Sequence, residues 1–168
     1  MRKILFVGKK DDIFISKFLQ RQKSYIYLSS SGVRLKNLDE NAVFIYDTGN
    51  NVTDLKIRYD LILFKNGQFI PFQIQPLLKS NGKALIASDN EKAKAMLQQQ
   101  QISSLTVGIR DGDISLCSVS DEGLTFFCRS GDLPETITGQ ERFIRGKIFP
   151  AGILPTITGE IVSLLCEK

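Results

Sequence analysis

A glycine and two lysines directly after an apolar N-terminal strand form an arrangement that could bind a phosphate group. The three residues are Gly8, Lys9 and Lys10. Free backbone N–H groups at a turn and at the start of the next helix attract anions, and lysine ammonium groups add positive charge. Asp11 and Asp12 follow at once, however, and two carboxylates at a helix start make good caps but repel a phosphate. The segment therefore predicts a phosphate site that has been lost, or a weak one that relies on Lys9 and Lys10.

Asp47 is a second candidate, because it follows the apolar residues 42–46 and precedes Thr48 and Gly49. In α/β folds, ligand-binding acids lie at the carboxyl ends of strands. The alternative is an Asx turn, in which the carboxylate accepts hydrogen bonds from the backbone that follows it. The loops after parallel strands meet at one edge of the sheet, which is the default position for a pocket. The glycine and polar residues expected there are Gly8, Lys9, Ser30, Asp47, Asn66 and Asp89.

The absence of histidine excludes several kinds of active site. Ser–His and Cys–His nucleophile pairs cannot form, and the commonest metal ligand is missing. Cys117, Cys128 and Cys166 are widely spaced and contain no C-x-x-C pair, so we expect buried reduced thiols rather than a zinc site. We therefore expect neither a metal nor a cofactor, and the sequence does not favour an enzyme.

Apolar segments of strand length alternate with helical or loop segments over the first 110 residues. Helical spacing marks residues 12–22 and 90–101, with Asp11 and Asp89 as expected N-caps, and residues 72–80 are interpreted as a short helix. The alternation predicts an α/β fold: a mostly parallel, Rossmann-like or P-loop-like sheet of five or six strands flanked by helices. The expected strands are residues 3–8, 25–28, 42–46, 61–64, 83–87 and 105–108.

The pattern changes after residue 110, where polar and apolar residues alternate between tight turns. Such alternation predicts a C-terminal antiparallel β-ribbon, and a helix with one apolar face follows. The ribbon strands are expected at residues 113–120, 124–128 and 135–148, and the helix at 157–167. We expect a single α/β domain over residues 1–168, divided into a parallel part (1–110), the ribbon (111–150) and a closing helix (151–168).

Composition is that of an ordinary globular protein, with 42% hydrophobic and 24% charged residues in a chain of 168. No run of about 18 apolar residues predicts a membrane span. The N-terminal segment is too short and too quickly polar for a signal peptide, so we expect a cytoplasmic protein. The net charge of +4 comes from scattered bases, which makes nucleic acid an improbable partner.

Several short segments follow one another in a recognisable order: ALIASDNE (84–91), TVGI (106–109), DISL (113–116) and GLTFF (123–127), with YDLILFKNG (59–67) before them. This order resembles the central ATP-binding domain of the Mur ligase family, bacterial enzymes that join amino acids to UDP-muramoyl precursors. The resemblance covers most of the chain and implies that the N-terminal strand and helix flank a phosphate loop. It also implies that Asp47 is the acidic residue expected after the third strand.

The chain departs from this family at the residues that carry its chemistry. The family's Gly-Thr-x-Gly-Lys-Thr loop corresponds to VGKKDD (7–12), which keeps one glycine, has lysine in another register and has no Ser or Thr at the helix start. The family's Asp-His metal segment cannot be present without histidine, and we find no counterpart of its C-terminal domain.

Two functional hypotheses follow from the matches and the departures. In the first, the chain is a non-catalytic, degenerate Mur-ligase-like domain that acts as a binding or interaction module. Its partner would be an unknown protein or a small ligand, and a homo-oligomer is one form that it could take. In the second, the chain is an enzyme or sensor that binds a nucleotide or small phosphorylated ligand at the carboxyl edge. Gly8, Lys9 or Lys10, and Asp47 would then hold the ligand.

Overall fold

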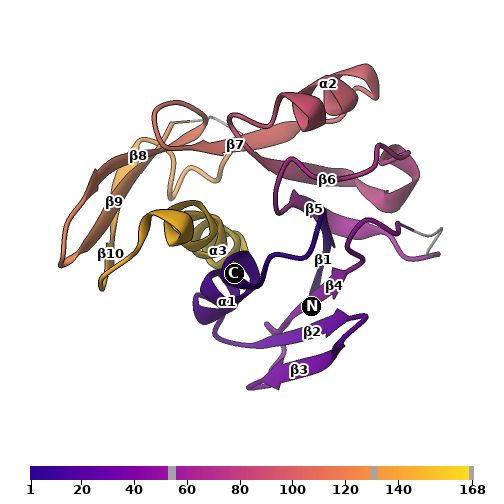
Figure 1. Cartoon of the computed structure of the whole chain (residues 1–168), viewed down its shortest axis with the longest axis horizontal. Helices are drawn as coiled ribbons and strands as arrows, with labels where there is room; N and C mark the ends of the chain where they lie inside the picture. The colour runs from indigo at the N-terminus through magenta and orange to yellow at the C-terminus, as the bar shows by residue number, and fades with distance from the viewer. Residues whose placement is uncertain (53–55, 130–131, 167–168) are drawn as a thin grey trace.

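Ten strands form one sheet in the computed structural model, which describes residues 1–52, 56–129 and 132–166 (Figure 1). The neighbouring strands from β8 to β2 pair in parallel, and β3, β9 and β10 pair antiparallel with their neighbours. The fold is therefore α/β, and its sheet carries the antiparallel strands that the C-terminal alternation predicted. In spatial order the strands are β10 (Gln140–Arg145), β9 (Gly123–Cys128), β8 (Ile114–Val119), β7 (Ser104–Gly108), β6 (Leu78–Ala87), β5 (Tyr59–Phe64), β1 (Arg2–Val7), β4 (Val43–Asp47), β2 (Tyr25–Ser29) and β3 (Gly32–Lys36).

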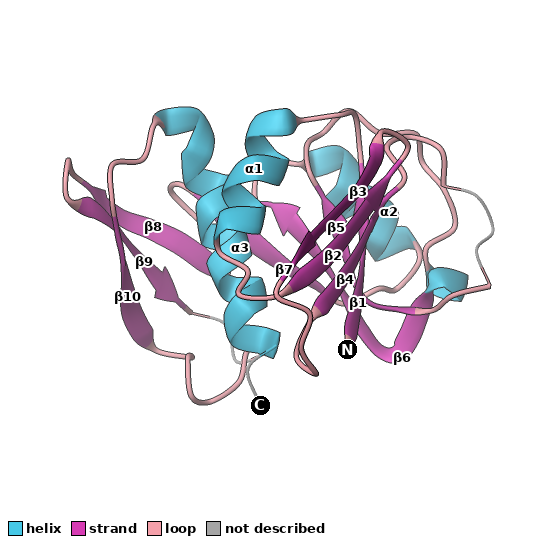
Figure 2. Cartoon of the chain, turned by 90° about the horizontal axis from the view of Figure 1, so that it is seen from below, coloured by secondary structure: helices cyan, strands magenta, loops and turns pink. Residues whose placement is uncertain are grey.

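Helices flank both faces of this sheet (Figure 2). One face packs against α1 (Asp12–Gln20) and α3 (Ile153–Cys166), and the other against α2 (Glu91–Gln99). Two short 3₁₀ turns, η1 (Gln75–Leu77) and η2 (Pro150–Gly152), precede β6 and α3. No helix in the described part of the chain is long and apolar enough to cross a membrane.

The central strand β1 is apolar throughout because both of its faces are covered. Ile4 and Phe6 point into the core under α1 and α3, whereas Leu5 and Val7 point into the core on the α2 side. All four side chains are at most 1% exposed. A continuous apolar run, rather than an alternating one, is the expected sequence of such a strand.

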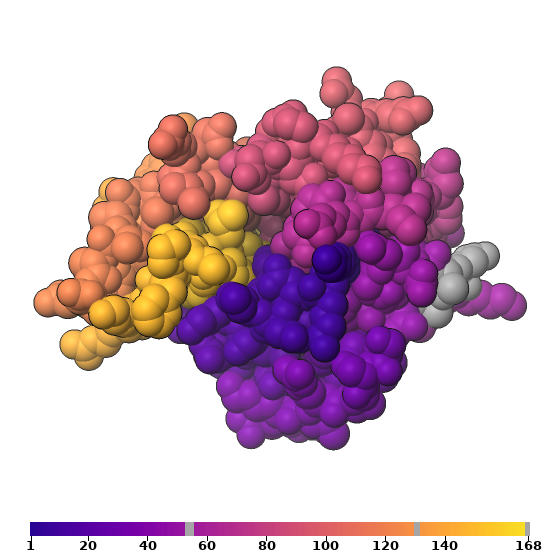
Figure 3. Space-filling model, viewed as in Figure 1, coloured from indigo at the N-terminus to yellow at the C-terminus, as the bar shows by residue number. Residues whose placement is uncertain are grey.

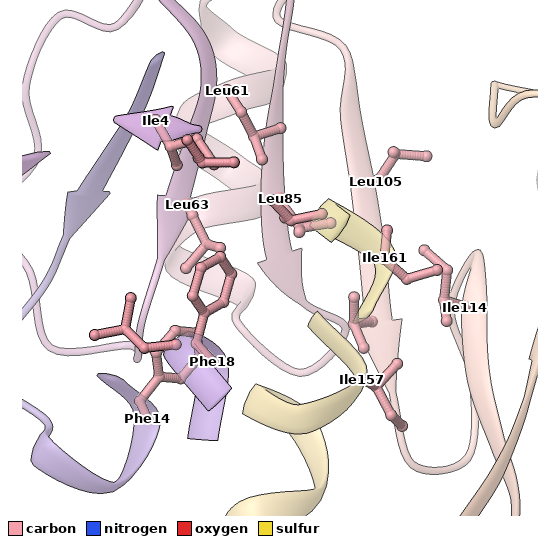
Figure 4. Close-up of a cluster of buried hydrophobic side chains, with 14 of the residues drawn as sticks. Ile4, Phe14, Phe18, Leu61, Leu63, Leu85, Leu105, Ile114, Ile157 and Ile161 are labelled. Atoms are coloured by element: carbon pink, nitrogen blue, oxygen red, sulfur yellow. The ribbon is translucent and has the colours of Figure 1, made fainter. Parts of the chain in front are cut away.

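The larger core lies between the sheet and the pair of helices α1 and α3 (Figure 4). Its densest part is aromatic: the ring of Phe18 meets that of Phe6 edge-on at 4.9 Å between centroids and stacks on Phe14 at 6.2 Å. From α3, Ile157 and Ile161 enter the same core and are 0% exposed. This core fixes α1, and with it the loop that precedes α1.

The smaller core, on the α2 side, contains one polar atom without a partner. The hydroxyl of Tyr59 is buried and makes no hydrogen bond among the described residues. Burial is the main reason that the pKa of Tyr59 is raised to about 12, and the nearby Tyr46 adds to it. An unsatisfied buried hydroxyl costs free energy without contributing a bond.

We therefore expect Tyr59→Phe to leave the free energy of unfolding unchanged or to raise it by up to about 1 kcal/mol. Tyr27→Phe is the matched control, because the Tyr27 hydroxyl donates a 2.8 Å hydrogen bond to Asp47. Loss of a bond to a charged acceptor should cost about 1.5–3 kcal/mol. Urea denaturation of both variants measures the difference. A Tyr59→Phe variant less stable than Tyr27→Phe would contradict this account.

Several predicted elements are corrected by the structure. The sheet has ten strands instead of five or six, because the ribbon strands continue it and because β3 was not expected. Residues 72–80 were predicted as a helix, but only the three-residue turn η1 forms there, and β6 begins at Leu78. The N-cap of α2 is Asn90, whose side chain accepts a bond from the Ala93 amide, and not Asp89. Helix α3 begins four residues earlier than expected, at Ile153.

The cysteines are free, but their burial differs from the expectation. Cys128 is buried and Cys166 is half-buried, whereas Cys117 is exposed near the end of β8. Ile114 is the register partner of Cys128, so the two hairpin thiols are not opposite each other. Burial raises the pKa of the Cys166 thiol to about 11, which makes it a poor nucleophile at neutral pH.

Candidate functional site

Three loops meet over the carboxyl end of β1. The amide of Gly8 donates to the carbonyl of Gly49 at 3.0 Å, and the amide of Lys9 donates to the carbonyl of Gln68 at 2.8 Å. The side-chain amide of Asn66 in turn donates to the carbonyl of Lys9 at 3.0 Å. The N–H groups of Gly8 and Lys9, which a phosphate loop would offer to a ligand, are therefore used within the protein.

Gly8 is the residue that permits this close approach. Its φ of +110° is unfavourable for residues with a side chain, and a Cβ at this position would lie 2.9 Å from Oδ1 of Asn66. The predicted glycine turn is present, but it brings the loop against its neighbours rather than around an anion.

The start of α1 is capped by a side chain of the protein itself. Asp11 is the N-cap as predicted, and its Oδ1 accepts a 2.9 Å hydrogen bond from the amide of Phe14. Asp12 is exposed and lies 3.6 Å from the ammonium group of Lys10, a solvent-exposed ion pair of little energetic value. Negative charge thus stands where the helix N-terminus would attract a phosphate.

Asp47 lies at the end of β4 and is almost completely buried. Both of its carboxylate oxygens accept hydrogen bonds from the ammonium group of Lys65, at 2.7 and 2.9 Å. Oδ2 also accepts from the Tyr27 hydroxyl, and Oδ1 accepts from the amide of Gly49 at 3.0 Å. The last bond is the Asx turn that was weighed as the alternative reading of this residue.

Lys65 is the residue at this edge whose role the sequence did not indicate. Its side chain is 1% exposed, and it reaches Asp47 from the end of β5 because β1 separates β5 from β4 by only one strand. Buried lysines are rare unless they are paired. In the sequence, Lys65 is only a lysine at the end of a predicted strand, and its burial and its pairing with Asp47 follow from the strand order.

The Asp47–Lys65 pair also affects Tyr27, whose hydroxyl donates to Asp47. Burial is the largest reason that the pKa of Tyr27 is strongly raised, and the hydrogen bond to the Asp47 carboxylate is the next. Tyr27 is therefore a neutral donor at all physiological pH values. The cluster of Asp47, Lys65 and Tyr27 has no net charge when the carboxylate and the ammonium are both ionised.

Two hollows flank this cluster. One, of about 230 Å³, lies between the N-terminus of α1, the ends of β5, β6 and β7 and the start of α3, and most of its lining is apolar. The other, of about 60 Å³, is lined mostly by polar residues and is too small for more than a small ion or water. Its lining includes Lys10, Asp12, Ser29, Ser30, Ser31, Arg34, Asp47 and Lys65.

The predicted site residues are thus only partly assembled. The carboxyl edge does bring together Gly8, Lys9, Asn66 and Asp47. Their polar groups, however, bond to one another and to neighbouring loops, and the charge of Asp47 is neutralised by Lys65. The side chain of Lys9 is exposed, as is that of Lys10. Asp89 is exposed too, and its neighbour Asn90 makes the contact with the carbonyl of Asn66 at 3.3 Å.

The nucleotide and magnesium ion that a phosphate loop implies do not fit this arrangement. A triphosphate would have to displace the carbonyls of Gly49 and Gln68 from the loop amides. A metal ion at Asp47 would have to displace the ammonium group of Lys65, which already occupies both carboxylate oxygens. Four donated hydrogen bonds leave that carboxylate with little capacity for another cation.

Comparison with solved structures identifies the fold. The chain is similar to MurF from Acinetobacter baumannii, with a TM-score of 0.62 and 10% sequence identity over 99% of this chain and 42% of the other. It is also similar to UDP-N-acetylmuramoyl-L-alanyl-D-glutamate–2,6-diaminopimelate ligase, with a TM-score of 0.59 and 13% identity over 98% of this chain and 43% of that one. MurF ligase from Thermotoga maritima, solved with ADP, gives 0.54 and 9% over 98% and 45%.

No protein-family model matches this chain, and no curated protein does. The chain spans less than half the length of the ligases to which it is similar. At this level of identity the likeness concerns the fold and not the chemistry. The resemblance seen in the order of sequence motifs is thereby confirmed: the chain has a Mur-ligase-like fold over almost its whole length.

Proposed function

We propose that this chain is a non-catalytic, degenerate Mur-ligase-like domain that acts as a binding or interaction module in the bacterial cytoplasm. The observation that carries the proposal is the closure of the loop at Gly8 and Lys9, whose amides donate to Gly49 and Gln68 instead of facing a ligand. Backbone amides are the main phosphate ligands of a phosphate loop, and an amide that already has a good partner has little to gain from a second one.

The pairing of Asp47 with Lys65 supports the same proposal from the other side of the loop. The ammonium group of Lys65 is bonded to the carboxylate of Asp47, which would have to be free in order to bind a metal ion. A domain that binds no nucleotide does not need an accessible carboxyl edge. What the domain then offers to the cell is its surface, to a protein partner or to a small ligand.

The direct test is calorimetric titration of the protein with magnesium–ATP. We expect no heat of binding up to millimolar nucleotide. Circular dichroism and a cooperative thermal transition would establish that the titrated sample is folded. Binding in the micromolar range would contradict the proposal and would direct the search to a nucleotide site near Lys9 and Asp47.

The alternative, a sensor of a small phosphorylated ligand, is favoured by one observation. The 60 Å³ hollow has room for a small anion such as a phosphate group, and its lining combines Lys10, Arg34 and the hydroxyl-bearing residues 29–31 with the carboxylates of Asp12 and Asp47. Titration with inorganic phosphate tests it, with Lys10→Ala and Arg34→Ala as variants and Lys147→Ala, an exposed lysine far along the chain, as the control. Affinity that falls in the first two variants only would favour this alternative over the interaction module.

A further inference from the structure

On the α2 side of the sheet, no helix in the described part of the chain covers β4, β2 and β3. The registers place Ile26 beside Phe44 on one side and beside Leu35 on the other, and they place Leu28 beside Val33. Residues in register point to the same face of a sheet. Their neighbours Tyr27, Val43 and Ile45 point the other way, into the core under α1. We call Ile26, Leu28, Val33, Leu35 and Phe44 the open face.

The open face is apolar and accessible. Val33 and Leu35 are 58% and 59% exposed, and the other three side chains are half-buried. Helix α2, on this side of the sheet, packs on β6 instead, five strands along the sheet from β3 (Figure 1). The hairpin of β2 and β3 belongs to the part of the chain that projects at the lower end of the molecule (Figure 3).

Charged groups of β3 are turned away from the open face. The Arg34 guanidinium lies 5.7 Å from the centre of the Tyr27 ring, and the Lys36 ammonium donates to the carbonyl of Gln22 at 2.8 Å. Edge strands normally carry charge to prevent association with other chains. Here both charges are held on the α1 side, so the opposite face has no charge of its own on β3 or β2. Beyond Phe44 the same row becomes polar at Lys3.

We propose that the open face binds the open face of a second copy of this chain, forming a two-fold symmetric dimer. An uncharged apolar surface is complementary to itself, which is what a two-fold interface requires. With Val33 and Leu35 58% and 59% exposed and the other three half-buried, the five side chains expose on the order of 300 Å² per copy, or about 600 Å² for a pair. Because about 60% of an interface is apolar, the total buried area is about 1,000 Å².

That area lies at the lower limit for specific association, so the dimer is expected to be weak. The inference does not depend on the state of the nucleotide site, since the two surfaces are separate. ATP binding would overturn the proposed function and leave the dimer untouched, and a monomeric protein would do the reverse.

Sedimentation equilibrium of the full chain between 5 µM and 1 mM tests the proposal. We expect a monomer–dimer equilibrium that Leu35→Glu weakens by at least tenfold. Phe143→Glu is the matched control, because Phe143 is 57% exposed on β10, the strand at the opposite edge of the sheet, and it should leave the equilibrium unchanged. Val33→Lys is a second variant, and both open-face variants should keep the thermal transition of the parent.

A protein that stays monomeric at 1 mM, or a dimer that Leu35→Glu and Val33→Lys leave intact, would overturn the proposal. So would a dimer that only Phe143→Glu disrupts, because it would place the contact at β10. Hydrogen exchange separates face packing from edge pairing: amides on the free edge of β3 should exchange equally fast in monomer and dimer. Their protection in the dimer would mean strand pairing instead of the packing proposed here.

Discussion

Replacing Lys65 by methionine is expected to lower the free energy of unfolding by about 3–5 kcal/mol. Methionine fills a similar volume but removes the ammonium group that bonds both oxygens of Asp47. The carboxylate is left in a site where its own side chain is only 5% exposed. A buried charge without a partner destabilises a protein by far more than an intact buried pair stabilises it. The loss of stability therefore reports the penalty of leaving the Asp47 carboxylate unpaired.

Chemical denaturation of Lys65→Met measures this effect, and two further variants define its origin. Lys147→Met removes one member of an exposed pair, with Lys147 and Asp121 66% and 92% exposed, and should cost less than about 1 kcal/mol. The double replacement Lys65→Met with Asp47→Leu should recover part of the stability, since no charge is left unpaired. A Lys65→Met variant within about 1 kcal/mol of the parent would contradict this account.

The second large effect is expected at Phe18, where replacement by alanine should cost about 3–5 kcal/mol. Phe18 is 0% exposed and contacts the rings of Phe6 and Phe14, so truncation leaves a cavity between β1 and α1. The aromatic contacts add to the loss of buried area. Because the α1 helix holds the loop at Gly8, this variant should also loosen the carboxyl edge.

Phe149→Ala is the control for Phe18→Ala, because Phe149 is 65% exposed and should tolerate truncation within about 0.5 kcal/mol. Denaturant titration of the two variants side by side gives the comparison. Equal losses for both phenylalanines would contradict the packing described between α1 and the sheet.

The sequence predicted the elements whose pattern is local. The run Ile4 to Val7 identified β1, and the spacing of Phe14 and Phe18 with Asp11 identified α1 and its cap. The α/β class and the C-terminal antiparallel strands followed from periodicity alone. These features depend on neighbours within a few residues, which is the information that one sequence contains.

Features that depend on distant partners were not predictable in this way. Residues 78–82 have little apolar alternation, yet β6 begins at Leu78, which pairs with Tyr59 of β5 before a register shift leads to the pairing of Lys83 with Leu61. The segment Gly32–Lys36 is exposed throughout, and its two apolar residues are too few to predict a buried strand; it forms β3 by pairing with β2. Tertiary context decides such segments.

The candidate site shows the same limit. Asp47 was identified as a strand-end acid with two possible roles, but its partner Lys65 lies 18 residues further on. Only the order β4, β1, β5 brings the two side chains together. The turn at Gly8 was predicted. The hydrogen bonds from this turn to two other loops could not be predicted, because the sequence does not give the positions of those loops.

Helix α3 returns from the C-terminal end of the chain to pack against α1 near the N-terminal end, as both views show (Figures 1 and 2). During synthesis, β1, α1 and the strands up to β10 leave the ribosome before α3 does. Until then the apolar side of α1 lacks Ile157 and Ile161 as cover. Nascent chains emerge at about 5–20 residues per second, so the exposed interval lasts seconds. The core that α1, α3 and the sheet form together is therefore completed only after translation has passed residue 166.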